Sequence, residues 1–147
     1  MFWGKAGQLE LLPKLSGGLV VPAAVFREVT VRKEEALLMA FLEKSGQLQI
    51  KPDGELRPEV LAWDLGSGES QAISLAVRLG AARVVLDDLE ARRCANSMNI
   101  RVTGSLGVVV MAKQKGLITQ AKPIVERLCQ VGLYLEDGLV AVVLNSE

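Results

Sequence analysis

Four acidic residues stand where the chain passes from one regular segment into the next. Glu69 follows two glycines at the start of an apolar helical pattern, and Asp87 and Asp88 directly follow an apolar run. Glu28 lies within about two helical turns of Pro22, which follows another apolar run. Carboxylates gathered in a partly dry site repel one another unless a cation neutralises them. These residues therefore suggest a site for Mg²⁺ or Mn²⁺, which can stabilise charge on a phosphodiester and activate a water to attack it.

Hydrophobic periodicity and Gly/Pro breaks predict the elements that would position these acids. A first short helix is predicted to end near residue 15, and further helices are predicted at 23–30, 34–44, 67–79, 89–98, 106–115 and 123–131, with a last apolar helix toward 145. Strands are predicted at 19–21, 48–51, 82–86 and 100–103, with a short segment at 133–135. One turn of helix is expected near Val60. This alternation predicts a single α/β domain over residues 1–147, a three-layer α/β/α sandwich with a central parallel sheet.

In such a sheet, helices that follow strands begin at the carboxyl edge of the strands. The helix that begins with Glu69 returns the chain to the opposite edge, so the strand at 82–86 delivers Asp87 and Asp88 back to the edge where Glu69 lies. Glu69 shares its helix face with apolar residues that should turn toward the sheet, namely Ala72, Ile73, Ala76 and Leu79. If the strand at 19–21 runs parallel to the others, Glu28 joins the same edge.

The composition excludes several other kinds of site. The chain of 147 residues has no histidine and only two cysteines, Cys94 and Cys129, so a metal must be held by oxygen. The cysteines are expected to be small buried hydrophobes. Seventeen basic and seventeen acidic residues cancel, so any basic surface for RNA is local. No secretory signal or long apolar run is visible, and we expect a cytoplasmic protein without membrane association.

Each acid also has an ordinary structural interpretation. Glu69 would be favoured in the first turn of a helix by the helix dipole alone. Asp88 can cap the helix that follows it and pair with Arg92 four residues on. Glu28 can be a solvated helical residue beside Arg27.

Other polar residues are expected at the same edge as candidate substrate contacts. Thr103 and Ser105 flank Gly104 at the end of a strand, where Ser105 could cap the next helix and its amide could hold a phosphate oxygen. Arg92 and Arg93 could form the local basic surface, although charged helical residues are usually just the solvated face.

Taken together, these segments resemble a known family. The run "GSGESQAISLAVRLGAARVVLDDLEARRCANSMNIRVTGSLGVVVMAKQKGLI", with "GQLELLPKL" and "VVPAAVFREV" before it, is similar to an uncharacterised prokaryotic branch of the PIN-domain family related to the VapC toxins. The resemblance implies a parallel sheet between helices and RNA cleavage with Mg²⁺ or Mn²⁺ held by about four acids. By position it implies ligand roles for Glu28, Glu69 and Asp87 or Asp88.

The chain departs from the pattern of this family in one respect. Family members usually begin with a central strand that ends in Asp or Asn, Thr, Ser, Pro and supplies the first acid, whereas residues 1–9 match the helix after it. We therefore expect a sheet lacking that usual first strand, and a dimer or partner contact near residues 1–20. The resemblance implies a metal-dependent toxin-type ribonuclease with RNA, an antitoxin protein and a second copy as partners. The alternative is a catalytically degenerate module that binds RNA or a protein.

Overall fold

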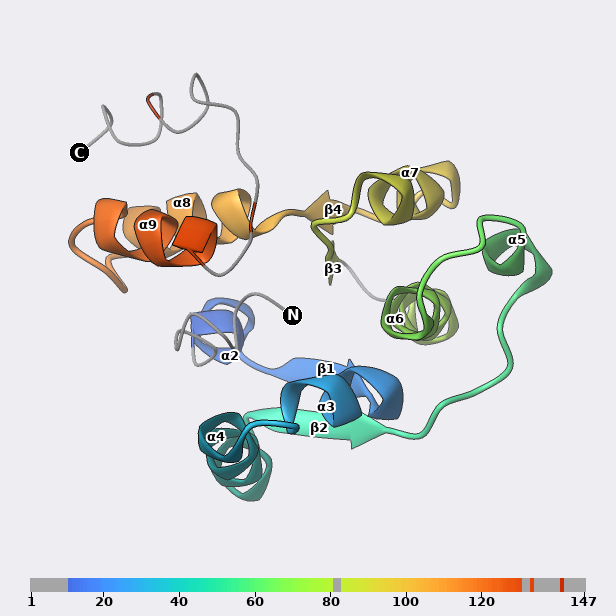
Figure 1. Ribbon diagram of the computed structural model, residues 1–147, viewed down its shortest axis with the longest axis horizontal. Coiled ribbons are helices and arrows are strands. Elements are labelled where there is room, and N and C mark those ends of the chain that lie inside the picture. Colours follow the sequence, from blue (N-terminus) through green and yellow to red (C-terminus); the bar gives the residue numbers. More distant parts are fainter. Residues whose placement is uncertain (1–10, 81–82, 131–132, 134–140, 142–147) are drawn as a thin grey trace.

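Two pairs of parallel strands form the sheets of this protein, whose computed structural model describes residues 11–80, 83–130, 133 and 141 (Figure 1). In the first pair, β1 (Leu19–Pro22) and β2 (Leu48–Lys51) place Leu19 opposite Leu48 and Pro22 opposite Lys51. In the second pair, β3 (Val84–Val85) and β4 (Val102–Thr103) place Val84 opposite Val102. The parallel α/β class is confirmed, but the described residues form two separate two-stranded sheets where the sequence predicted one central sheet.

Helices connect and cover these strands, and most begin and end within two residues of their predicted bounds. They are α2 (Leu11–Ser16), α3 (Ala23–Val29), α4 (Lys33–Lys44), α5 (Pro58–Leu61), α6 (Ser67–Leu79), α7 (Leu89–Ser97), α8 (Ser105–Gln114) and α9 (Lys122–Gln130). Gly80 ends α6 in the left-handed conformation with a φ of 61°, which glycine adopts without steric cost. The segments predicted at 133–135 and toward 145 lie outside the described residues, apart from the buried Leu133 and residue 141.

Helix α6 links the two sheets. It packs against β1 of the first sheet, β3 of the second sheet, and the helices α3, α5 and α7. Accordingly it is buried on more than one side, with Ser70, Gln71, Ile73, Ser74 and Leu75 all inside the protein. The predicted face was only partly right, because Leu79 is 50% exposed. A helix in contact with strands of both sheets fixes the position of one sheet relative to the other.

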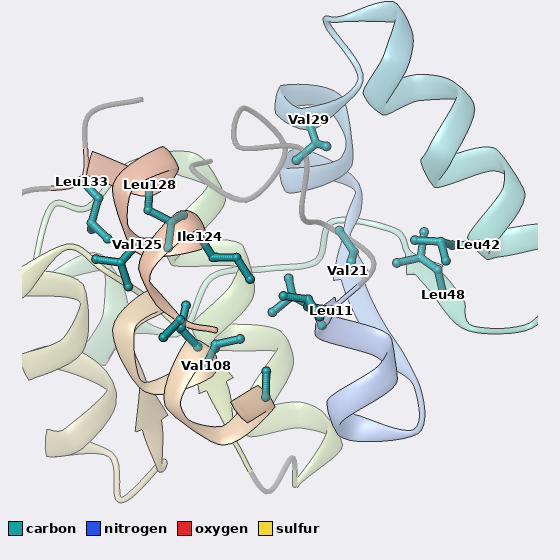
Figure 2. Packing of buried hydrophobic residues seen from close by; sticks show 14 of the residues in the cluster. Leu11, Val21, Val29, Leu42, Leu48, Val108, Ile124, Val125, Leu128 and Leu133 are labelled. Carbon is teal, nitrogen blue, oxygen red and sulfur yellow. The ribbon is translucent and has the colours of Figure 1, made fainter. Parts of the chain in front are cut away.

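Two apolar cores follow from this arrangement. The larger core brings α8 and α9 together with α2, β1, α4 and β2; Figure 2 shows Leu11 between Val108 and Val21. The second core joins α6 to α5, α7 and the β3–β4 pair around Val60 and Ile73. Burial of apolar surface of this kind is the main favourable contribution to folding.

The sequence pattern predicts Leu37, Leu38, Phe41 and Leu42 on one apolar face of the helix at 34–44, but α4 does not bury them together. Leu37 and Phe41 are each 64% exposed, whereas Met39 and Leu42 are buried in the larger core together with Glu35 on the same side. The sequence places apolar residues on several sides of this helix, and the contact with β2 selects the side that is buried.

The two cysteines also differ from each other. Cys94 is fully buried in the second core, and burial raises the pKa of its thiol. Cys129 lies exposed on α9, so the prediction that both cysteines are buried was wrong for this residue. A period-3.6 pattern alone cannot show that α9 buries Val125 and Leu128 while Cys129 faces solvent.

The link formed by α6 can be tested by truncating its most buried apolar side chain. Ile73 has no exposed surface, so Ile73→Ala should lower the free energy of unfolding by about 2–5 kcal/mol through lost burial and a residual cavity. Leu79→Ala at the exposed end of the same helix is the matched control and should cost less than about 1 kcal/mol. Urea denaturation measures both, and equal effects would contradict the proposed burial of α6.

Candidate metal-binding site

Helix α3 is held at its start by an acid from a distant part of the sequence. Pro22 occupies the N-cap position and offers no side chain that could cap the helix. Instead, Oδ1 of Asp53 accepts a hydrogen bond from the backbone N–H of Ala24 at 2.9 Å, and Oδ2 lies 2.7 Å from Nη2 of Arg27. Because Pro22 pairs with Lys51 in the parallel sheet, residue 53 comes just beyond the end of β2, close to the first turn of α3. Asp53 therefore orients the helix that carries Glu28.

Glu28 brings its carboxylate to the first turn of α6. A Cβ placed on Gly68 would lie 3.2 Å from Oε2 and 3.3 Å from Oε1 of Glu28. Gly68 thus permits a close approach that a larger residue would oppose. Although Glu28 is largely exposed, its carboxylate lies against another element of the fold.

Glu69 lies in the same turn of α6. Its carboxylate folds back over the N-cap residue, since a Cβ on Gly66 would lie 2.7 Å from Oε2 of Glu69. The helix dipole favours an acid at this position, and the same partial positive charge attenuates the repulsion between the carboxylates of Glu69 and Glu28. Among the ion pairs of the described chain, none involves either glutamate. Two carboxylates therefore share one helical turn without a cationic partner.

Asp87 lies beyond the end of β3 and is bound to the start of α8. Its Oδ1 accepts a hydrogen bond from the backbone N–H of Ser105 at 2.7 Å, and its Oδ2 accepts one from the Ser105 hydroxyl at 2.5 Å. These bonds tie β3 to the helix after β4 and leave each carboxylate oxygen one further lone pair.

Asp88 takes the ordinary structural role that its position suggested. It is the N-cap of α7, and its Oδ2 accepts a hydrogen bond from the backbone N–H of Ala91 at 3.0 Å. The expected pairing with Arg92 is not among the ion pairs of the described residues. Of the two adjacent aspartates, Asp87 is the one directed toward other elements.

The two arginines differ in their surroundings. A Cβ on Gly104 would lie 3.5 Å from Oδ1 of Asp87 and 3.7 Å from Nη1 of Arg92, so the guanidinium of Arg92 lies near this aspartate. Arg93 instead donates to Oε1 of Glu90 at 2.9 Å on the exposed face of α7. Arg92 is thus the arginine that lies beside an acid of the candidate site.

Thr103 and Ser105 are both buried and occupied by internal contacts. The Cγ2 methyl of Thr103 lies 3.0 Å from the Cβ position of Gly107. Ser105 has no exposed surface, and both its backbone N–H and its hydroxyl donate to Asp87. The prediction that Ser105 caps α8 was wrong, since Gly104 is the N-cap and Ser105 begins the helix.

A divalent ion fits part of this arrangement. Magnesium commonly binds through one or two carboxylates and keeps several waters, and the pair of Glu28 and Glu69 supplies that number of oxygen ligands without a competing cation. Within the described residues, no group of three or more acidic or cysteine side chains is close enough to hold a metal ion. Glu28 and Glu69 thus both lie at the first turn of α6, whereas Asp87 is bound separately at the start of α8.

Gln71 is a residue that the sequence analysis did not identify. It is 9% exposed, its Nε2 donates to the carbonyl oxygen of Gly54 at 3.1 Å, and its Oε1 accepts from the N–H of Gly54 at 3.2 Å. Arg78 lies against the same glycine, because a Cβ at residue 54 would be 2.9 Å from its Cζ. The sequence signal that could have identified Gln71 is a glutamine within the apolar pattern of α6, because a buried amide requires hydrogen-bond partners.

These features define a parallel α/β protein with acids at the starts of α6 and α7 and beyond the end of β3. The family model described as PIN domain matches residues 2–146, and the chain belongs to this family, whose fold is of the nuclease type. No curated protein and no solved structure matches the chain. Proteins of the PIN-domain family generally depend on a divalent metal, which agrees with the oxygen-only donor set.

Within residues 11–80 and 83–130, no helix is long and apolar enough to cross a membrane.

The capping of α3 predicts a specific dependence of stability on pH. The hydrogen bond from Arg27 holds the pKa of Asp53 below its ordinary value of 3.8. A lowered folded-state pKa stabilises the protein above the ordinary value, and this contribution is lost as pH falls through the lower folded value. The free energy of unfolding of wild type should therefore exceed that of Asp53→Ala by about 1 kcal/mol near neutral pH, a typical value for a helix cap. The difference should be smaller in acid.

Urea denaturation of both proteins between about pH 6 and about pH 3 measures the difference. Asp64→Asn, at an exposed position before α6 with a φ of 51°, controls for the general effect of removing an acid, because asparagine tolerates this left-handed conformation. A difference between wild type and Asp53→Ala that stays constant across this pH range would contradict the assigned role.

Proposed function

We propose that this protein hydrolyses phosphodiester bonds of RNA in the cytoplasm with Mg²⁺ or Mn²⁺, in the manner of the toxin-type members of its family. The observation that carries the proposal is the pair of carboxylates from Glu28 and Glu69 at the first turn of α6, where neither has a cationic partner within the described chain. They come from different elements, and their convergence is a product of the fold.

The residues around this pair take distinct roles in the proposal. A bound divalent ion would offset negative charge on the phosphodiester and lower the pKa of a water molecule. Glu28 and Glu69 hold the ion, and Asp87, oriented by its two bonds from Ser105, supplies a further carboxylate from the end of β3. Arg92 neutralises a phosphate of the RNA backbone, while Asp88 serves α7 as its cap.

A second candidate function rests on the same site. Asp87 and Asp88 each accept hydrogen bonds from a helix start, and the described residues hold no group of three acids in ligand geometry. These observations favour the alternative of a module that binds RNA or a protein without cleaving it.

The toxin-type proposal also includes protein partners. We propose a small antitoxin protein and a second copy of this chain as partners. The dimer has support from α4, where Leu37 and Phe41 lie one turn apart and are each 64% exposed. The part of the expected contact region within residues 1–10 lies outside the described residues.

Metal titration tests the two-carboxylate site directly. Mn²⁺ binding followed by electron paramagnetic resonance should weaken on the order of tenfold or more in Glu28→Gln and in Glu69→Gln, because each loses a charged ligand without losing side-chain volume. Glu43→Gln, on the exposed face of α4, should bind as wild type does. If wild type bound no Mn²⁺, metal-dependent hydrolysis would be rejected.

RNA cleavage separates the two candidate functions. Wild type with Mn²⁺ should cleave a mixed single-stranded RNA, and a chelator or Glu69→Gln should abolish the products. Retention of RNA in a gel-shift assay at low salt without cleavage would support the binding module instead.

The close approach at Gly68 gives an independent test of the site. Gly68→Ala should change the free energy of unfolding by less than about 1 kcal/mol, because alanine is a good helix former. The added Cβ lies within 3.3 Å of both carboxylate oxygens of Glu28, so it should displace them and weaken Mn²⁺ binding. Gly18→Ala, before β1, is the control for a methyl group added elsewhere, because a Cβ there meets nothing within 4 Å. Mn²⁺ affinity unchanged by Gly68→Ala would contradict the assigned position of Glu28.

A further inference from the structure

A turn between β2 and α5 contacts both helices that carry the glutamate pair. Residues 52–54 follow β2, and Asp53 and Gly54 are adjacent in this turn. Asp53 bonds to the backbone of α3 and to Arg27, the neighbour of Glu28. Gly54 bonds through both its N–H and its carbonyl oxygen to Gln71, two residues after Glu69. The turn therefore connects α3 to α6 by polar bonds on both sides.

We infer that Asp53 and Gln71 form a clamp that sets the position of Glu28 relative to Glu69, and that both act as positioning residues for the metal site. The inference rests on the proposed function for its role in metal binding, although the bonds themselves do not. Neither side chain reaches the carboxylates; each acts through the backbone of the helix or turn that it holds.

The chemistry of Gln71 explains why a neutral amide is required. Its amide presents one donor and one acceptor to the complementary groups of Gly54, as a neighbouring strand would, and its burial excludes competing water. A glutamate would accept from the N–H of Gly54 but could not donate to its carbonyl oxygen while ionised. A carboxylate at this position would also add a third negative charge close to Glu28 and Glu69.

The start of α3 needs such a contact because the helix is short and has no cap of its own. Pro22 gives α3 a fixed start but no cap, and α3 is only seven residues long. A short helix without a cap has few interactions that define its orientation. Because Glu28 lies in its last turn, a small rotation of α3 would move that carboxylate away from the first turn of α6.

The inference predicts that loss of either bond displaces Glu28 without unfolding the protein. Gln71→Met keeps the volume of the buried side chain, and Asp53→Ala removes the cap. Positioning residues around metal ligands typically alter affinity by about 10–100-fold, and we expect Mn²⁺ affinity to fall by about tenfold in each variant. The double variant should bind about as weakly as either single variant, because both bonds belong to one clamp.

Gly54→Ala is the matched control. It retains the backbone N–H and carbonyl oxygen that bond to Gln71, and the atoms nearest to its added Cβ are those at the flexible end of Arg78, which can shift at little cost. Its Mn²⁺ affinity should equal that of wild type. An affinity as low as that of Gln71→Met would show that any disturbance of the turn has the same effect, and would overturn the specific role of the bonds.

A measurement without metal separates this inference from the proposed function. In the metal-free protein, nuclear magnetic resonance should detect a nuclear Overhauser contact between the Glu28 side chain and the Gly68 α-protons, and this contact should disappear in Gln71→Met and in Asp53→Ala. Its persistence in both folded variants would overturn the clamp. If the contact disappears in both variants and the wild-type protein binds no Mn²⁺, the clamp would be supported and the metal-dependent function rejected.

Discussion

The packing of α6 against both strand pairs is the constraint on which the rest of the structure depends. In the described residues the strands do not form one continuous hydrogen-bonded sheet, so their relative position is set by side-chain packing: α6 contacts strands of both pairs, and α8 contacts both β4 and α2. Apolar burial is strong but not directional, and a helix in contact with two sheets and three helices could settle in several orientations. The hydrogen bonds of Gln71 and Asp53 are directional, and they restrict the orientation of α6 and α3 where apolar packing does not.

The start of α6 carries the chemical consequence of this packing. Two glycines leave room beside the first turn, and the carboxylates of Glu28 and Glu69 occupy that room. The positive end of the helix dipole makes a negative charge less unfavourable there, although it does not replace a counter-ion. The ordinary interpretation of Glu69 and the proposed metal role are therefore compatible, because the helix end that favours an acid leaves its carboxylate without a cationic partner among the described residues.

The aspartates show how adjacent residues of one type divide between roles. Asp88 faces its own helix and caps it, whereas Asp87 crosses to Ser105 at the start of α8 and joins β3 to the segment after β4. The sequence shows two acids after an apolar strand and a polar turn further on. Which acid reaches that turn depends on the direction in which the chain leaves β3, and this direction is a property of the folded backbone.

The sequence by itself determined the alternation of elements and the starts of the helices. Glycine and proline breaks placed α6 at Ser67 and ended it at Gly80, because these residues have restricted or unusual backbone freedom that acts locally. It also determined that any metal would have to be held by oxygen ligands, since the chain has no histidine and only two separated cysteines. The tertiary structure alone decided that the strands form two pairs, that Leu37 and Phe41 face solvent, and that Asp53 and Gln71 hold the helices of the glutamate pair. Those features join residues far apart in the chain, and no local pattern records which distant groups will meet.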